Sequence, residues 1–287
     1  MRAMQYLYYS LVSVTPLIMF HRTSELFEFN KMLFIYAVTG FIIVLWVTRM
    51  LLSRSIIIKN TLFSPLLLFF FASQLLATVF SIDPWTSFFG YYGRFNGGLL
   101  SIFCYIALYQ AFVSNFTGVQ LQQSVRGIFK FSLLGSILVM LWGLPSKFGY
   151  DLSCLLFTGK LDVACWTDQF KPTIRVFSTL GQPNWLGSYI SVNFFIGLYF
   201  LSNTVSRINW RSLLYALYLS SNFAMLLLTR SRSSLIGTLI GLALFIFYLC
   251  IQHRHALMSK TYKKRHTAFC GCNACIYYPG KNRHCTD

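Results

Sequence analysis

Residues 212–251, SLLYALYLSSNFAMLLLTRSRSSLIGTLIGLALFIFYLCI, decide the fold class of this chain. One unbroken helix over this stretch would be about 60 Å long at about 1.5 Å per residue, twice the hydrocarbon thickness of a bilayer. Its charged residues are Arg230 and Arg232. The chain is therefore predicted to turn at these arginines and to cross a membrane twice, with helices over 212–228 and 233–251.

The composition of the whole chain supports a membrane location. Of its 287 residues, 56% are hydrophobic and 11% are charged, whereas soluble domains carry about a quarter charged residues. Because a spanning helix needs about 20 apolar residues, we predict an all-α polytopic membrane protein with about eight transmembrane helices. The other predicted spans are 4–20, 32–52, 62–80, 97–114, 128–145 and 185–202.

Basic residues between the apolar runs predict the orientation of the helices. The net charge of +17 would suit a nucleic-acid partner, but cations in short loops fit the positive-inside rule better, so no such partner is expected. We place the N-terminus and the basic C-terminal tail in the cytoplasm. All acidic residues except Asp287 then fall in outside loops. The predicted inside cations before the tail are Arg2, Arg49, Arg54, Lys59, Arg126, Lys130, Arg207 and Arg211.

Two of the predicted outside segments differ from ordinary short loops. Residues 81–96, SIDPWTSFFGYYGRFN, are rich in aromatic side chains, and residues 146–184 form the longest hydrophilic connection before the tail. A connection of that length with no clear helix or strand pattern is often functional. We therefore expect the functional surface on the non-cytoplasmic side.

The arginine pair at the predicted turn has no acidic residue near it in sequence. Arg binds phosphate oxygens through its planar guanidinium fork, so Arg230 and Arg232 suit an anionic ligand such as phosphate or pyrophosphate. Ser231, Ser233 and Ser234 could add hydroxyl donors at the start of the next helix, where the helix dipole favours anions. The alternative is that both arginines extend towards lipid headgroups at the interface.

A second candidate point for binding an anion lies just before the predicted helix 185–202. Pro183 and Asn184 are typical of a helix start. Exposed backbone N–H groups there, with Gln182, Asn184 and Arg175 nearby, would favour an anion. An ordinary loop and cap is the alternative interpretation.

A third cluster lies in the first outside loop. It consists of Asp83, Tyr91, Tyr92, Arg94 and Asn96, and aromatic faces beside polar side chains could hold sugar rings. An aromatic belt at the membrane interface explains the tyrosines equally well.

The cysteines of the long outside loop and those of the tail suggest different roles. Cys154 and Cys165 lie in the long outside loop, where a disulfide is permitted and would stiffen the loop; two free thiols are the alternative. Residues 252–287 hold half of the cysteines, but their spacing fits no paired C-x-x-C zinc pattern, so no metal is expected. We predict that this basic tail is disordered or shifted in reading frame.

Three segments, in this order and spacing, resemble the superfamily of O-antigen ligases and O-antigen polymerases, which includes bacterial protein O-oligosaccharyltransferases. They are FGYYGRFNGGLLSIFCYIALY (89–109), RVFSTLGQPNWLGSYISV (175–192) and LLLTRSRSSLIGTLIGL (226–242). The middle segment is the most specific. The last is similar to a Ser-Arg-Gly-like motif of the family, with Ser233 where Gly is usual. The resemblance covers most of residues 1–250.

The resemblance implies a glycosyltransferase of the GT-C kind in the bacterial cytoplasmic (inner) membrane. Such proteins transfer a glycan from an undecaprenyl-pyrophosphate carrier to a glycan, lipid or protein acceptor outside that membrane, and they use no cofactor at this step. Arg232, Arg230 and Arg175 would hold the pyrophosphate leaving group, where positioned Arg stabilises developing charge. The glycan would contact Arg94, Tyr92, Asn96, Gln182 and Asn184.

The sequence after residue 251 departs from the family, whose members continue with a large outside loop carrying a His that acts on the acceptor. We therefore expect residues 1–251 to be a fragment of the transmembrane domain that lacks the acceptor-side catalytic loop, and we assign no catalytic residue. Two rival functions are a multi-pass transporter or flippase and a non-catalytic membrane scaffold. Apolar runs without internal charges argue against ion-coupled transport.

Overall fold

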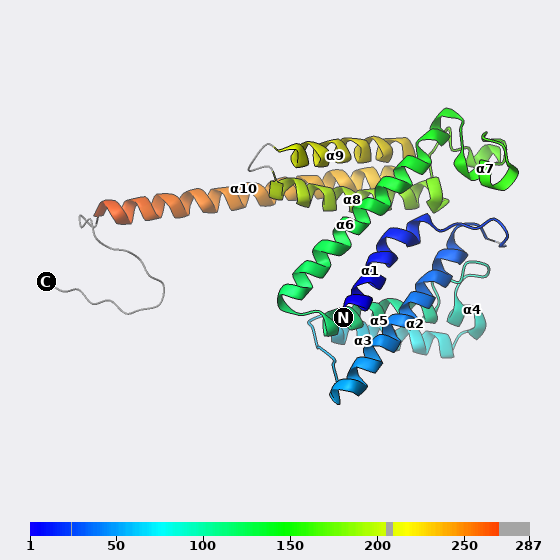
Figure 1. Cartoon of the computed structure of the whole chain (residues 1–287), viewed down its shortest axis with the longest axis horizontal. Helices are drawn as coiled ribbons and strands as arrows, with labels where there is room; N and C mark the ends of the chain where they lie inside the picture. The colour runs from blue at the N-terminus through cyan, green and yellow to red at the C-terminus, as the bar shows by residue number, and fades with distance from the viewer. Residues whose placement is uncertain (24, 205–208, 270–287) are drawn as a thin grey trace. The chain divides into compact units, whose positions relative to one another are not determined.

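The computed structural model describes residues 1–23, 25–204 and 209–269, and every regular element within them is helical. The chain divides into two compact units, Met1–Ile236 and Gly237–Asp287. The α-helices (Figure 1) are α1 Arg2–Val14, α2 Glu28–Ser53, α3 Ser64–Val79, α4 Pro84–Phe89, α5 Leu99–Asn115, α6 Gly118–Gly143, α7 Leu152–Thr158, α8 Pro183–Thr204, α9 Trp210–Thr229 and α10 Arg232–Phe269. The 3₁₀ turns are η1 Thr15–Leu17, η2 Pro145–Phe148, η3 Asp168–Phe170 and η4 Ser178–Leu180.

Every predicted span contains a helix, but fewer helices than predicted have the length of a membrane span. In the described part of the chain, 5 helices are long and apolar enough to cross a membrane, namely α2, α6, α8, α9 and α10. The helices α1, α3 and α5 have 13, 16 and 17 residues. At about 1.5 Å per residue these three are shorter than the roughly 30 Å of hydrocarbon in a bilayer. The structure is therefore all-helical with five candidate spans.

Two helix boundaries differ from the prediction for local reasons. The first helix ends at Val14 and continues only as a 3₁₀ turn, because Pro16 lacks an N–H group and its ring disfavours a continuing α-helix. The helix α6 begins at Gly118 instead of at 128. Its first turns are polar, so an apolar run does not reveal them. They still contact α1, because Gly127 lies directly against the ring of Tyr9.

The helices of the first unit pack as a series of neighbours. The helix α5 contacts both α3 and α2, α1 lies between α2 and α6, and α8 contacts both α6 and α9 (Figure 1). A buried cluster joins α1, α2 and α5, and there the Tyr8 hydroxyl donates to the Leu108 carbonyl at 2.7 Å. By contrast, α3 has no buried residue. Apolar helix faces that remain exposed are expected of a protein whose solvent is partly lipid.

Polar side chains link α6, α8 and α9 in the interior of the first unit. The Ser132 hydroxyl donates to Asn193 Oδ1 at 2.8 Å. The Tyr218 hydroxyl lies 2.7 Å from Ser136 Oγ and accepts from Asn222 Nδ2 at 3.0 Å. These groups are uncharged, and hydrogen bonds of this kind hold membrane helices together.

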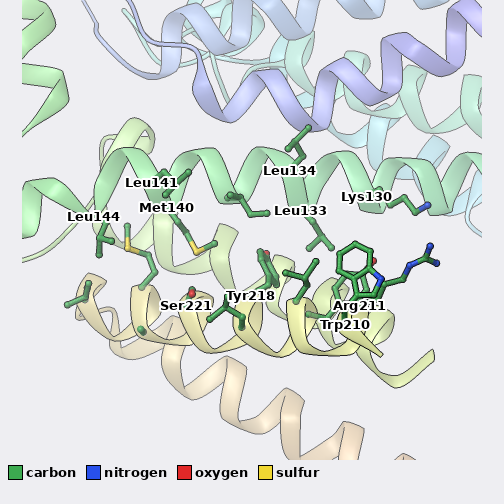
Figure 2. Close-up of a pocket in the computed structure, with 17 residues that line it drawn as sticks. Lys130, Leu133, Leu134, Met140, Leu141, Leu144, Trp210, Arg211, Tyr218 and Ser221 are labelled. Atoms are coloured by element: carbon green, nitrogen blue, oxygen red, sulfur yellow. The ribbon is translucent and has the colours of Figure 1, made fainter. Parts of the chain in front are cut away.

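A large groove runs between α6 and α9 (Figure 2). Its volume is about 950 Å³, and most of the side chains that line it are apolar. Lys130, Trp210 and Arg211 lie at one end of the groove, and Leu144 lies at the other.

The loops of the first unit fall into two groups at opposite ends of its helices. At one end, Thr179 Oγ1 donates to the Pro16 carbonyl at 2.7 Å and Lys31 Nζ donates to the Thr179 carbonyl at 2.6 Å. At the other end, Arg49 donates to Asn115 Oδ1 at 2.8 Å. We call these the Arg175 end and the Arg49 end. The predicted outside segments 81–96 and 146–184 both belong to the Arg175 end.

The second unit consists of the continuation of α10 from Gly237 to Phe269 and of residues 270–287, which lie outside the described residues. The helix thus extends beyond residue 251, where the sequence predicted a change to a disordered tail. All the tail cysteines, and with them the question of a metal, lie outside the described residues.

Candidate functional site

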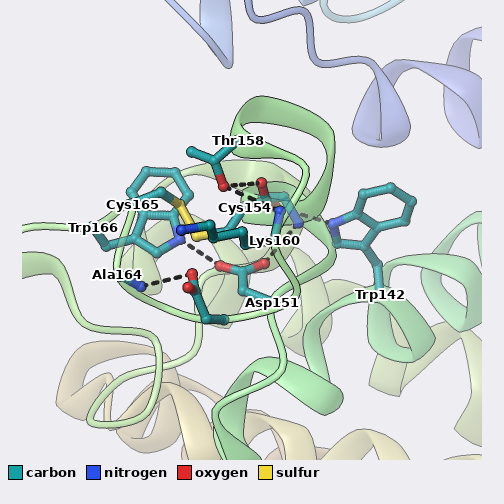
Figure 3. Close-up of a disulfide and its surroundings, with 10 residues drawn as sticks. Trp142, Asp151, Cys154, Thr158, Lys160, Ala164, Cys165 and Trp166 are labelled. Atoms are coloured by element: carbon teal, nitrogen blue, oxygen red, sulfur yellow. Dashed lines mark hydrogen bonds between the residues drawn. A yellow bond between two sulfur atoms is a disulfide. The ribbon is translucent and has the colours of Figure 1, made fainter.

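The long segment 146–184 contains regular structure that the sequence pattern did not predict. It includes α7 and the turns η3 and η4. A disulfide joins Cys154 to Cys165 with a Cα–Cα distance of 5.6 Å (Figure 3). This bond joins α7 to the stretch of loop that follows it.

Asp151 organises the loop around the disulfide (Figure 3). Its carboxylate is buried, with 3% of the residue exposed, and accepts from the Ser153 amide at 2.8 Å, which caps α7. The Trp166 indole N–H donates to the other oxygen of the same carboxylate. The Trp166 ring also lies 5.0 Å from the Phe177 ring and 6.0 Å from the Phe27 ring. The loop is therefore anchored to the start of α2.

Arg175 joins three segments that are distant in sequence. Its Nε donates to the Thr229 carbonyl at 3.2 Å, and its Nη2 donates to Asn184 Oδ1 at 3.0 Å. The next residue, Val176, donates its amide to the Leu228 carbonyl at 3.2 Å. These bonds hold the long loop, the start of α8 and the end of α9 together. Because a guanidinium carries five N–H groups, Arg175 keeps further donors for a ligand.

Arg230 and Arg232 flank the turn that Arg175 holds. Arg230 ends α9 in the left-handed conformation, with φ 50°, and Arg232 is the first residue of α10. Both are exposed. Within the described residues, neither side chain has a hydrogen bond or an ion pair. Two guanidinium groups without a partner among the described residues therefore lie on either side of Ser231, and an anion site there stays a prediction.

Two of the three serines expected to offer hydroxyl donors at the turn are buried. Ser231 and Ser234 are 2% and 7% exposed, and their hydroxyl oxygens lie 3.0 Å apart. Ser191 Oγ on α8 donates to the Ser234 carbonyl at 3.3 Å. These two serines pack against α8 because Gly187 has no side chain to keep them away. Of the three predicted hydroxyl donors, Ser233 alone is exposed.

A small cavity of about 120 Å³ lies beside Arg175 and is lined by Gln182, Asn184 and Lys171, among others. Ligand pockets are usually about 300–1,000 Å³, so this cavity can admit one small anionic group but not an oligosaccharide. Lys171 is ion-paired with Asp168, and this contact lowers the pKa of Asp168 below its usual value. Lys171 therefore contributes less free positive charge than the arginines do.

The first outside loop reaches the same site through Arg94. Its Nε lies 3.5 Å from Glu28 Oε2, and its guanidinium lies 5.2 Å from the Tyr91 ring and 5.7 Å from the Trp185 ring. Trp185 follows Asn184, the partner of Arg175. Arg94, one of the predicted glycan residues, thus lies near the start of α8, where Asn184 bonds to Arg175, although Arg94 is already paired.

The loop 89–98 is closed by a tight backbone contact. The Tyr91 amide donates to the Asn96 carbonyl at 3.0 Å. Gly90 has φ 92°, and a Cβ there would lie 2.2 Å from the Asn96 carbonyl oxygen. A glycine is therefore required at this position. The turn leaves Tyr92 89% exposed at its tip, while Asn96 Oδ1 accepts from the Tyr105 hydroxyl at 3.5 Å.

Three residues of this region were missed by sequence reasoning. Lys31 is 8% exposed and donates to the Phe27 carbonyl, just before α2, and to the Thr179 carbonyl in the long loop. Glu28 pairs with Arg94, and Trp185 provides the second ring for the same guanidinium. A charge pair three residues apart at the start of an apolar run was the available signal for Glu28 and Lys31, but it does not identify their partners.

Comparison with protein-family models, curated proteins and solved structures gives no match for this chain.

Proposed function

We propose that this chain is a membrane glycosyltransferase of the O-antigen ligase type, with its donor site at the Arg175 end. The observation that carries the proposal is the arrangement of Arg175, Arg230 and Arg232 around one turn between two apolar helices. A lipid that ends in a pyrophosphate presents dense negative charge at the membrane surface. Arginine recognises such groups through bidentate hydrogen bonds.

The proposed donor is an undecaprenyl-pyrophosphate-linked glycan, and the acceptor is a glycan, lipid or protein hydroxyl. The acceptor hydroxyl oxygen attacks the first sugar carbon, and the bond from that carbon to the pyrophosphate oxygen breaks. Undecaprenyl pyrophosphate leaves as an anion, and the hydroxyl proton passes to water. Guanidinium groups already in place would stabilise the charge that develops on the leaving oxygen. The sugar would lie towards Tyr92, Arg94 and Trp185.

The proposed location is the bacterial cytoplasmic membrane, with the Arg175 end outside and with the N-terminus and the tail in the cytoplasm. The loops of the Arg175 end hold all the acidic residues except Asp287, whereas those of the Arg49 end hold cations such as Arg49, Arg54 and Lys59. The positive-inside rule counts Lys and Arg, and 15 of the 24 lie on the proposed cytoplasmic side once the tail is included.

The test compares binding of an undecaprenyl-pyrophosphate-linked glycan to purified wild type and to the Arg230→Gln, Arg232→Gln double variant. Each lost charge-assisted hydrogen bond is worth about 1.5–3 kcal/mol, so binding should weaken at least about tenfold. Arg54→Gln is a matched control, because Arg54 ends α2 with a similar φ of 48° at the Arg49 end. Equal affinity of the double variant and wild type would refute the donor site.

Activity in reconstituted liposomes separates the rival functions. Transfer of glycan to an added acceptor is expected for the enzyme. Movement of the lipid-linked glycan across the bilayer without transfer would indicate a flippase, and binding with neither outcome would indicate a scaffold.

A further inference from the structure

The groove between α6 and α9 has the lining of a lipid site. Aliphatic side chains and methionines from both helices form its walls, among them Ile137, Met140, Leu217 and Met225. From Lys130 to Leu144 the groove follows α6 for about 21 Å at about 1.5 Å per residue. This is most of the depth of a bilayer's hydrocarbon, which is roughly 30 Å. Ala224, a small exposed residue, keeps the groove open on the α9 side.

One end of the groove is cationic (Figure 2). Lys130 on α6 and Arg211 on α9 both lie there, beside Trp210. The Arg211 guanidinium lies 6.0 Å from the Trp210 ring, and neither cation has an ion pair in the described part of the chain. The sequence has no acidic residue between Asp83 and Asp151 or between Asp168 and Asp287. No carboxylate near these two helices in sequence can therefore neutralise the pair.

This cationic end is distinct from the candidate donor site. Arg211 and Arg230 lie near opposite ends of α9, which places them about 28 Å apart along the helix axis at about 1.5 Å per residue. A headgroup held by Lys130 and Arg211 therefore belongs to the leaflet at the Arg49 end, whereas Arg230 and Arg232 face the other leaflet.

We infer that the groove between α6 and α9 binds an anionic phospholipid, with its phosphate at Lys130 and Arg211 and its acyl chains along the groove. The charge of the headgroup complements the two cations, and the Trp210 indole suits the interface between headgroups and hydrocarbon. An unpaired cluster of Lys and Arg next to a helix is typical of anionic-lipid binding. A zwitterionic lipid would bring its own cation close to the same side chains and would bind more weakly.

The test measures binding of phosphatidylglycerol and phosphatidylcholine with identical acyl chains to the detergent-purified full chain by native mass spectrometry. Wild type should prefer phosphatidylglycerol. Lys130→Gln and Arg211→Gln should each reduce that preference about fivefold, as expected for one cation near an anionic headgroup. Ala224→Trp should reduce binding of both lipids, because the indole would occupy the groove.

Matched controls separate this site from general surface charge. Lys59→Gln and Arg54→Gln remove exposed cations from the Arg49 end outside the groove, and they should leave the preference unchanged. The Arg230→Gln, Arg232→Gln variant should also keep it, so that this inference and the donor site can fail separately. An equal preference in wild type and in the Lys130, Arg211 double variant overturns the inference. So does a disulfide between two copies carrying Leu217→Cys, because the occupant would then be a second chain.

Discussion

Arg230 and Arg54 adopt nearly the same backbone conformation, each ending a helix in the left-handed region with φ 50° and 48°. Glycine is favoured at such positions, and a larger residue is uncommon there. The conformation alone does not indicate a site, since Arg54 shares it. What distinguishes Arg230 is its neighbours, because Arg175 is bonded to the preceding carbonyl and Arg232 follows two residues later.

Gly187 provides a prediction at the scale of single residues. A Cβ at Gly187 would lie 2.9 Å from Ser234 Cβ and 3.0 Å from Ser231 Cβ, and neither of these atoms can rotate away. Gly187→Ala should therefore destabilise the protein by about 1–3 kcal/mol. Gly40 is the control, because it also lies inside a helix but has nothing within 4 Å of the added Cβ. Gly40→Ala should stabilise by about 0.5–1 kcal/mol.

Melting temperatures of the two glycine variants in the same detergent give the comparison. The predicted shifts have opposite signs, so a general effect of alanine on a membrane helix cannot imitate the result. Equal shifts for both variants would mean that α8 does not approach the Ser231 turn as closely as the structure shows.

The long loop shows how secondary elements can form in a segment without an apolar period. The helix α7 is short, and it is held by a capping carboxylate, a disulfide and an indole contact instead of by a broad apolar face. The same loop supplies Arg175 and the η4 turn. In that turn the Thr179 hydroxyl donates to the Pro16 carbonyl, and the Thr179 carbonyl accepts from Lys31 Nζ. The long loop must therefore be ordered for Arg175 to reach its position.

The disulfide provides a prediction at the scale of a single element. Cys154→Ala should destabilise the protein by about 2–3 kcal/mol, the chain-entropy cost for a short closed loop. Reductant should lower the melting temperature of wild type as much as the Cys154→Ala substitution does, and it should leave the melting temperature of the variant unchanged. Cys104→Ala serves as the control, because Cys104 is a free buried thiol on α5. If reductant has no effect on wild type, the cysteines are not paired.

At the scale of the whole first unit, the loops separate into two ends with different charge. The Arg49 end carries cations without acids, and the Arg175 end carries both. An anionic membrane surface attracts the uncompensated positive charge of the Arg49 end. The separation also places the two proposed lipid sites in different leaflets.

Labelling with a membrane-impermeant maleimide tests this separation. In a background with the free cysteines changed to serine, Tyr92→Cys, Phe170→Cys and Arg230→Cys should all react from the same side of the membrane. Lys59→Cys and Val119→Cys should react only from the opposite side, because all five positions are exposed and the first three lie at the Arg175 end. Labelling of Tyr92→Cys and Lys59→Cys from one side would contradict the arrangement of the helices.

The sequence by itself determined the helical class and the positions of the apolar helices, because hydrophobic runs of sufficient length leave few other structures. It also marked Arg230 and Arg232, since one helix through both apolar runs would be about twice as long as the hydrocarbon is thick, and the arginines are the charged residues at which it can turn. Only the tertiary structure decided that Arg175 binds Thr229, that Arg94 is paired with Glu28, and that Ser231 and Ser234 face α8. These contacts join residues far apart in the chain, and no local pattern of polarity or spacing specifies which partner a side chain meets. The same reason explains the groove between α6 and α9, whose cationic end brings Lys130 and Arg211 together from two helices.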